Sequence, residues 1–553
     1  MATALTQNRL ARMVWPSTSQ PLTSMRPLRR QCVSAFSYTR LYSEQTSPDT
    51  KAGQTKPKDG SHIGEKQQAG SKAPTYVHRG SAINFAIGDK YRIREPHEGP
   101  PLSAENWEDH PNARLEEFDE LPYELFGTNQ HIEFHAEFKK ELTRLLRSYR
   151  APIMYAFAYG SGIFPQAKPN RHVSDEEYRS VHPKPSQALK EVQASGPKSI
   201  DLIFGVTHTQ HWHSLNMRQH PEHYSSLAKF GSGLVSTTQE RWGAGVYFNP
   251  YVIQNGVQIK YGVTSIDNLC TDLSSWNNLY LAGRLQKPVK ILRDHPRVRL
   301  ANQANLISAV RTALLLLPPQ FTENELYSTI AGLSYLGDPR MALPTESPSK
   351  VTDIVTHNMT SFRKLYGPLL ATLPNVDFTA TTPDNADPDA NAKLSQDMDP
   401  TKRANMVRRL PSTFRSRLYF QYQKKFMMPR GEFRALMEAS KDEGEESFKR
   451  RTGGGFERRI VQDDPAELQE IIRKVIRQTV NWPATAQTIK GFFTAGVRRS
   501  LRYVYEKWTK FRAGKAKMAA KKQEEAALKQ EASKQETAKQ EIKVEAKEKT
   551  KQE

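Results

Sequence analysis

The feature that most constrains the fold is a glycine turn at the end of an apolar run. Residues 152–159 are apolar and rich in aromatic side chains, and the run is long enough for a buried strand. It ends at Gly160-Ser161-Gly162, where two glycines let the backbone turn sharply and present N–H groups and one hydroxyl to an anion. An ordinary tight turn is the alternative, because a short glycine motif carries little information alone. The pattern predicts a strand followed by a phosphate-binding turn.

A second apolar strand is headed by an acid. Residues 201–206 read Asp-Leu-Ile-Phe-Gly-Val. A carboxylate at the start of a neighbouring strand can hold a divalent cation against a phosphate in the glycine turn. Residues 167–199, which separate the two motifs, are polar and contain prolines, and we interpret them as an inserted loop. Nucleotidyl transfer needs at least a phosphate-binding turn and a metal-binding carboxylate, and residues 160–162 and Asp201 are predicted to supply them.

The charge of the chain limits its partners. The 553 residues carry a formal charge of +21, which favours nucleotides, nucleic acid or acidic lipid as ligands. The two cysteines, Cys32 and Cys270, are too few for a disulfide framework or a Cys-rich metal site. No apolar run approaches the ~20 residues of a membrane-spanning helix. If the protein works on a membrane, we expect it to lie on the surface.

Four tracts are predicted to lie outside the folded body. Residues 1–42 contain arginines and hydroxyl side chains but no Asp or Glu, a composition typical of a mitochondrial transit peptide. Residues 43–105 are interpreted as a disordered linker. The acidic, Pro/Asp-rich residues 376–401 are predicted to be a disordered insertion, and residues 515–553 a charged low-complexity tail.

A dense polar and aromatic stretch follows Asp201. His213, Asn216 and His223 are predicted to line a polar groove that receives a ligand phosphate or base. The alternative is that they are hydrogen-bonded structural residues. A zinc site is disfavoured, because the spacing of the histidines fits no tetrahedral pattern and no cysteine assists.

Further candidate ligands follow in the next predicted elements. Lys260 lies in the strand-like segment 259–263 and is expected to neutralise a phosphate, unless it is an exposed strand lysine. Ser265 is predicted to begin a helix in which Asp272 lies beside the apolar stripe and faces a cleft. Arg284 and Lys287 flank the turn before a last strand at 289–292, and we expect them to bind phosphate.

Helical patterning dominates the next region, residues 294–375. Residues 305–317 have helical spacing, and Thr322 with Glu325 forms a capping box that predicts a helix through Tyr335. We assign these residues to the core.

The region 402–514 is predicted to bind a membrane surface. After Pro483, apolar side chains recur at helical spacing: Ile489, Phe493, Val497, Leu501, Val504, Trp508 and Phe511. The cations around this stripe are Lys490, Arg498, Arg499, Arg502, Lys507, Lys510 and Arg512. An apolar face rimmed with cations is typical of an interfacial helix on anionic lipid, although a helix packed on the protein's own core is the alternative. The basic, aromatic residues 406–425 are a candidate second contact.

Eight sequence blocks, in order, resemble one known family. They are Tyr-Gly-Ser-Gly-Ile-Phe-Pro-Gln (159–166), Asp-Leu-Ile-Phe-Gly-Val (201–206), Trp-His-Ser-Leu-Asn (212–216), His-Tyr-Ser (223–225), Gly-Val-Tyr-Phe-Asn-Pro (245–250), Ile-Lys-Tyr-Gly-Val (259–263), Asp-Leu-Ser-Ser-Trp-Asn-Asn-Leu-Tyr (272–280) and Ala-Gly-Arg-Leu-Gln-Lys-Pro-Val (282–289). Together they resemble the mitochondrial CDP-diacylglycerol synthases, which are phosphatidate cytidylyltransferases. The resemblance extends from about Leu121 to Leu370.

The resemblance implies a fold class and an activity. The fold would be α+β, with a nucleotidyltransferase-like mixed sheet over residues 106–293, a helical, winged-helix-like lobe over 294–375 and a C-terminal amphipathic helix. The enzyme would transfer CMP from CTP to phosphatidic acid with Mg²⁺, for cardiolipin and phosphatidylglycerol synthesis. It would be a peripheral protein on the matrix side of the mitochondrial inner membrane, with no nucleic-acid partner.

The resemblance also implies roles for single residues. The turn at 160–162 would hold the triphosphate, and Asp201 would hold Mg²⁺. Lys260 and Arg284 would offset phosphate charge. The broad nucleotidyltransferase pattern has a second acid two positions after the first, where this chain has Ile203. We therefore expect the second metal ligand to come from elsewhere, with Asp272 as the candidate.

Two other functions remain open on the sequence. A mitochondrial RNA nucleotidyltransferase would share the basic charge and the glycine turn. A non-enzymatic scaffold that supports inner-membrane protein import is the other alternative.

Overall fold

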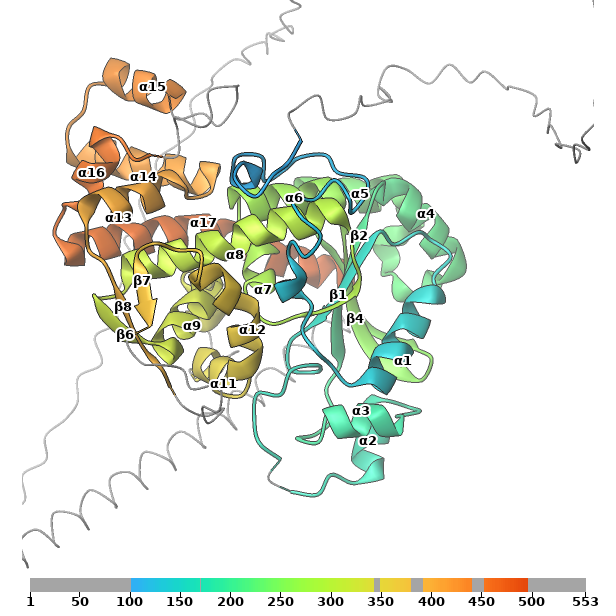
Figure 1. Ribbon diagram of the computed structural model, residues 1–553. Coiled ribbons are helices and arrows are strands. Elements are labelled where there is room, and N and C mark those ends of the chain that lie inside the picture. Colours follow the sequence, from blue (N-terminus) through green and yellow to red (C-terminus); the bar gives the residue numbers. More distant parts are fainter. Residues whose placement is uncertain (1–100, 170, 343–348, 379–390, 440–451, 496–553) are drawn as a thin grey trace, which may run out of the picture. The chain divides into compact units, whose positions relative to one another are not determined.

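The computed structural model describes residues 101–169, 171–342, 349–378, 391–439 and 452–495 (Figure 1). The predicted transit peptide and charged tail lie outside these residues, as does nearly all of the predicted linker. The predicted interfacial helix lies outside them beyond residue 495, which includes Val497, Leu501, Trp508, Arg498 and Arg499.

A five-stranded mixed sheet forms the first part of the fold, in the order β3-β4-β2-β1-β5. Its strands are β1 (Tyr155–Tyr159), β2 (Ile200–Val206), β3 (Tyr247–Gln254), β4 (Val257–Ser265) and β5 (Lys290–Arg293). Strand β2 pairs antiparallel with β1 and parallel with β4. The register places Asp201 opposite Tyr159 on one side and Lys260 on the other. The predicted strands at the glycine turn and at Asp201 are confirmed and are direct neighbours.

Helices and short 3-10 turns surround this sheet. They are η1 (Trp107–Asp109), η2 (Thr128–Gln130), α1 (Ala136–Arg147), α2 (Asp175–Val181), α3 (Gln187–Val192), α4 (Thr209–Gln219), η3 (Pro221–His223), η4 (Ser226–Phe230), α5 (Ser232–Arg241), α6 (Ile266–Ser275) and α7 (Ala282–Leu285). The predicted inserted loop at 167–199 therefore contains two short helices, α2 and α3. Ser174 and Ser186 cap these helices, and Tyr178 and Leu189 bury one side of each.

A second lobe follows the long helix α8 (Pro296–Leu316). It contains α9 (Glu323–Gly332), η5 (Leu333–Tyr335), α10 (Pro339–Ala342), α11 (Lys350–Thr356) and α12 (Met359–Leu370). The capping box of Thr322 and Glu325 is present at the start of α9, as predicted. The lobe also has a three-stranded sheet in the order β6-β8-β7, formed by β6 (Gln320–Thr322), β7 (Val376–Phe378) and β8 (Lys393–Gln396). The prediction of disorder throughout 376–401 is therefore wrong at both ends, because strand pairing there satisfies the backbone of polar segments.

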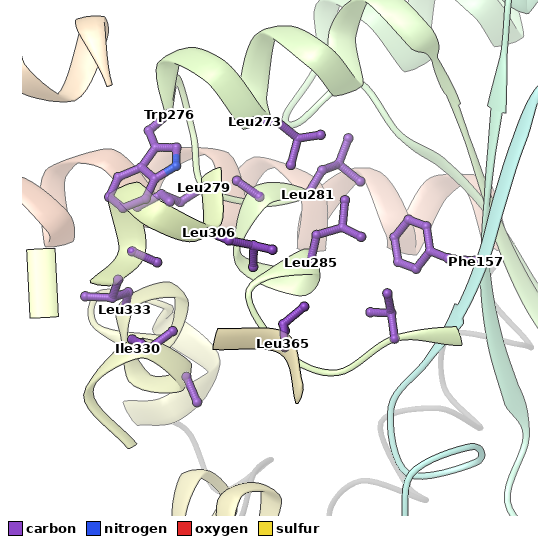
Figure 2. Packing of buried hydrophobic residues seen from close by; sticks show 14 of the residues in the cluster. Phe157, Leu273, Trp276, Leu279, Leu281, Leu285, Leu306, Ile330, Leu333 and Leu365 are labelled. Carbon is purple, nitrogen blue, oxygen red and sulfur yellow. The ribbon is translucent and has the colours of Figure 1, made fainter. Parts of the chain in front are cut away.

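The two sheets share one apolar core. Helix α8 is buried on nearly every face and packs against α6, α9, α12 and α17. Figure 2 shows Phe157 of β1, Leu273 of α6, Leu285 of α7, Leu306 of α8 and Leu365 of α12 within this cluster. A helix without a polar face belongs in an interior. The core therefore holds the first sheet and the second lobe in one body.

The described residues of the C-terminal region form five helices: α13 (Pro400–Arg408), α14 (Ser412–Lys425), α15 (Arg430–Ala439), α16 (Gly455–Val461) and α17 (Pro465–Ala495). Tyr419, Tyr422 and Arg415 are buried, and Arg415 donates hydrogen bonds to the carbonyls of Arg408 and Leu410. Most of the aromatic side chains in segment 406–425 thus pack inside the protein, whereas Phe420 is 45% exposed, and a membrane contact at this segment stays a prediction. No described helix is both long and apolar enough to span a bilayer.

Helix α17 packs on β3 and α14. Gln487 donates to the carbonyl of Val246. Lys490, which was expected at a solvent-facing cationic rim, is fully buried, and its Nζ donates to the carbonyls of Gln239 and Trp242. The predicted helix is present here, and the two described residues of its apolar stripe, Ile489 and Phe493, are 50% and 59% exposed, whereas the rim residue Lys490 faces the protein.

Asp272 holds the chain that follows α6. The helix begins at its predicted cap, Ser265, and ends before Trp276, which has a φ of +54°. The buried carboxylate accepts four backbone hydrogen bonds: Oδ1 from Asn278 and Leu279, and Oδ2 from Leu281 and Ala282. Burial raises the pKa of Asp272, against the lowering effect of these four donors. The side chain orders the loop between α6 and α7.

We expect Asp272→Asn to destabilise the protein, because an amide nitrogen would face two backbone donors. The free energy of unfolding should fall by about 3 kcal/mol, as measured by chemical denaturation. Asp267→Asn, at an exposed position on the same helix, is the matched control. If Asp272→Asn unfolds like the parent but changes the Mg²⁺ dependence of activity, Asp272 is a metal ligand after all.

Candidate active site

A cavity of about 490 Å³ opens between the first sheet, the second lobe and α17. The sheet side contributes Tyr159, Gly160, Ser161, Asp201, Lys260 and Arg284, and the second lobe contributes Ser334, Arg340, Lys350 and Asn358. Val480 and Ala484 of α17 complete the wall. Residues from three parts of the chain therefore converge on one space.

The glycine turn lies against the start of β2. Gly160 has a φ of +79°, a backbone conformation that side chains other than glycine rarely adopt. A Cβ at Gly160 would lie 3.4 Å from Asp201 Oδ2, and one at Gly162 would lie 2.6 Å from the carbonyl oxygen of Ser199. Gly160 and Ser161 line the cavity, whereas Gly162 lets the turn approach the neighbouring chain. The turn and the carboxylate share one site, as predicted.

Asp201 and Lys260 form the polar floor of the cavity. They are neighbours on parallel strands, and Lys260 Nζ lies 3.9 Å from Asp201 Oδ1. Lys260 Nζ also lies 4.8 Å from the ring centroid of Phe248. Both charged side chains are partly exposed to the cavity. At this separation the carboxylate keeps oxygens available for another cation.

Arg284 is held between aromatic rings. Its guanidinium carbon lies 3.8 Å from the ring centroid of Tyr280 and 5.5 Å from that of Tyr159. It also donates to the carbonyl of Tyr280. The stacked guanidinium is thereby fixed at the cavity wall.

Lys287 is a buried amine on the same wall. Its Nζ donates to Ser334 Oγ at 3.0 Å and to the carbonyl of Gly283. Burial, together with the positive charges of Arg284 and Lys350, lowers its pKa to about 7. A bound anion would restore the charged form of this amine.

The second lobe supplies ligands that the sequence did not reveal. Arg340 is clamped by Asp338, with Nε at 3.0 Å from Oδ1 and Nη2 at 2.6 Å from Oδ2. Lys350 begins α11, and Asn358 lies at the N-terminal end of α12. No local motif marks these residues, because their role depends on the packing of the second lobe against the sheet.

The cavity is strongly basic. Its described lining residues include the cations Lys198, Lys260, Arg284, Lys287, Arg340 and Lys350. They also include two carboxylates, Asp201 and Asp338, and Arg340 engages the second. Such a wall suits a ligand with several phosphate charges.

Five predicted site residues lie outside the cavity lining: Gly162, His213, Asn216, His223 and Asp272. Asp272 uses its oxygens on the backbone, so the expectation that it faces the cleft is wrong. His213 is buried, with Nδ1 at 2.9 Å from the hydroxyl of Tyr224 and Nε2 at 2.8 Å from Gln239 Oε1. Asn216 is also buried and donates to the hydroxyl of Tyr224 at 3.0 Å. Burial lowers the pKa of His213 to about 4, so it is neutral at physiological pH. His223 is buried as well, with Nδ1 at 2.9 Å from the hydroxyl of Tyr261, so the groove expected at His213, Asn216 and His223 is a closed polar network.

One other group of potential metal ligands lies outside this cavity. His220 Nδ1 lies 3.2 Å from Glu222 Oε1, and His223 Nε2 lies 3.4 Å from the same oxygen. The two imidazole rings are nearly parallel, with centroids 4.4 Å apart. The in-plane lone pairs of parallel rings do not converge on one ion. We interpret the group as a histidine pair that shares a carboxylate.

Comparisons with known proteins agree with this geometry. A family model described as "Phosphatidate cytidylyltransferase, mitochondrial" matches residues 142–510, a range that contains both walls of the cavity. Proteins of that same name match from several organisms. The Schizosaccharomyces pombe protein is 37% identical over 69% of this chain and 86% of its own length. The Saccharomyces cerevisiae protein is 45% identical over 44% of this chain and 58% of its own length.

The third relative, from Rattus norvegicus, is 34% identical over 68% of this chain and 95% of its own length. The residues that the family model matches include the glycine turn, the acid-headed strand and the second lobe. A basic cavity with this turn and carboxylate, together with these matches, leads to one conclusion: the chain belongs to the mitochondrial phosphatidate cytidylyltransferase family.

Proposed function

We propose that the cavity transfers CMP from CTP to phosphatidic acid and so produces CDP-diacylglycerol and pyrophosphate. The observation that carries this proposal is the joint wall of Ser161, Asp201 and Lys260 opposite the cations of the second lobe. A nucleoside triphosphate and a lipid phosphate both need positive surroundings at the moment of transfer. The family membership supports the same chemistry.

The reaction needs positioning more than acid–base catalysis. An oxygen of the lipid phosphate attacks the α-phosphorus of CTP, and the bond to the β-phosphate breaks to release pyrophosphate. A phosphomonoester has a second pKa of about 6, so the attacking phosphate is already largely ionised near neutral pH. Ser161 and the turn amides would orient the triphosphate, while Lys260 and Arg284 would offset its charge.

Asp201 fits a single-carboxylate Mg²⁺ site. Magnesium in such enzymes is commonly held by one or two carboxylates together with substrate phosphates and water. Asp201 faces the cavity beside the glycine turn, whereas Asp338 is engaged by Arg340 and Asp272 by the backbone. When bound, the ion would neutralise charge on the triphosphate. Ile203 replaces the second acid of the nucleotidyltransferase pattern. The metal-coordination position of that acid would then be taken by substrate or water rather than by Asp272.

We place the reaction at the mitochondrial inner membrane, on the matrix side, as a step toward cardiolipin and phosphatidylglycerol. The mitochondrial names of the relatives and the composition of residues 1–42 support the mitochondrial part of this proposal. The lipid acceptor supports a peripheral position on a membrane.

The two alternatives are separated by one assay with purified protein. Labelled CTP is offered with phosphatidic acid or with tRNA. Formation of labelled lipid supports the proposal, and labelled tRNA supports an RNA nucleotidyltransferase. Absence of both products supports a scaffold.

Asp201→Asn should lower the rate of CDP-diacylglycerol formation by at least about 10²-fold, because a metal-bound carboxylate would be lost. The melting temperature should stay near that of the parent. Asp119→Asn, at an exposed acid outside the cavity lining, serves as the control. A folded Asp201→Asn variant with full activity would remove the carboxylate from the mechanism.

Arg340→Ala and Lys350→Ala should each lower kcat/KM by about 10-fold or more, since each removes a cation that faces substrate phosphate. Initial rates with CTP and phosphatidic acid varied separately will show which substrate is affected. Lys364→Ala is the matched control, because Lys364 is an exposed lysine of α12 that pairs with Glu133. Parental kinetics in both cavity variants would restrict the site to the sheet side.

The low pKa of Lys287 predicts a pH dependence. The amine is charged below about pH 7 and neutral above it. Anion binding, measured as kcat/KM for CTP, should therefore weaken as the pH rises through that value. Lys287→Arg should keep its charge and move this alkaline limb to higher pH. An unchanged limb in Lys287→Arg would assign it to another group.

A further inference from the structure

An exposed apolar surface lies where α17 meets η4 and α5. Phe230 is 76% exposed, Leu234 40%, Trp242 54% and Ile489 50%. We call these four residues the η4–α5–α17 surface. Large apolar side chains that gather in the open mark interaction sites more often than isolated ones do.

Specific contacts fix the two halves of this surface to each other. The buried Nζ of Lys490 donates to the carbonyl of Trp242 at 2.6 Å and to that of Gln239 at 3.2 Å. These carbonyls lie at the C-terminal end of α5, where a cation is favourable. Ser225 Oγ, just before η4, donates to the carbonyl of Phe493 at 3.4 Å. Ile489 and Trp242 are thus brought together across some 250 residues of sequence.

Cations accompany the apolar side chains. Lys229 and Arg241 are exposed on η4 and α5. Arg241 follows Leu234 by seven residues, so both lie on one face of α5. Glu240 is the acid of α5, and its carboxylate accepts a hydrogen bond from Thr209. In the sequence alone, residues 496–515 contain seven Lys or Arg and a single acid.

We propose that the η4–α5–α17 surface docks on an anionic lipid bilayer. Aromatic and aliphatic side chains beside cations are the pattern of interfacial binding. The positive charge of residues 496–515 complements an anionic membrane, whereas binding of a protein partner would not require that charge. The contact would be made by residues of the catalytic body itself, in addition to any helix beyond residue 495. The inference rests on the proposed function only for the lipid nature of the substrate.

Helix α17 connects this surface to the cavity. Val480 and Ala484 line the cavity, and Ile489 lies five residues further on, about 8 Å along the helix axis. A bilayer against Ile489 and Trp242 would place lipid headgroups close to the segment of α17 that lines the cavity. Docking and lipid entry would then use one continuous element.

The test uses the full chain and vesicles of phosphatidylcholine mixed with phosphatidylglycerol. The double variant Phe230→Ser/Trp242→Ser should bind these vesicles at least about 10-fold more weakly in sedimentation, since two large apolar contacts are lost. The control Leu125→Ser/Met427→Ser removes two exposed apolar side chains elsewhere and should bind like the parent. Activity on a water-soluble, short-chain phosphatidic acid should stay within about 2-fold of the parent in both variants.

Three results would overturn the inference. The first is vesicle binding by Phe230→Ser/Trp242→Ser that equals binding by the parent. The second is a loss of its activity on the short-chain lipid that is as large as its loss of vesicle binding. The third is a larger species in light scattering without lipid that the double variant abolishes, since a second copy of the chain would then cover the surface. Vesicle binding that depends on Phe230 and Trp242 without any CDP-diacylglycerol formation would retain the docking surface and refute the proposed function.

Discussion

The shared apolar core around α8 is the constraint on which the site depends. Six cations line one cavity, and without a ligand they repel one another. The lowered pKa of Lys287 reports this repulsion together with burial. Because Leu306, Leu285 and Leu365 belong to one continuous core, the two charged walls cannot simply move apart (Figure 2). Hydrophobic burial thus holds together a site with more cations than carboxylates, whose excess positive charge an anionic ligand would neutralise.

The cationic side chains of the cavity are held in place before a ligand binds. A polyphosphate in the cavity would pair with amines and guanidinium groups that are already oriented by Tyr280, Ser334 and Asp338. Little side-chain entropy remains to be lost when these groups meet a ligand. Charge repulsion in the empty cavity is therefore relieved by substrate rather than by rearrangement.

Sequence patterns predicted the part of the site that is local in the chain. The glycine turn, Asp201 and Lys260 could be predicted because apolar runs identify strands, and adjacent strands align their ends. Asp272, His213 and Asn216 could not be assigned in this way. A polar side chain beside an apolar stripe can face solvent or satisfy buried backbone and hydroxyl groups, and only tertiary packing decides. Arg340 and Lys350 join the cavity from another lobe, so no spacing in the sequence relates them to Ser161.

Helix α17 shows the same limit in a different form. Its periodicity predicted an amphipathic helix correctly, but periodicity does not say what covers the apolar stripe. The structure divides the helix by partner: Val480 and Ala484 face the cavity, Gln487 and Lys490 bond to the catalytic body, and Ile489 remains exposed. Lys490 decides this division, because its buried ammonium ties α17 to the end of α5. Burial lowers the pKa of Lys490 to about 7. The two carbonyls that accept from Lys490 therefore hold the exposed side of α17 at the C-terminal end of α5.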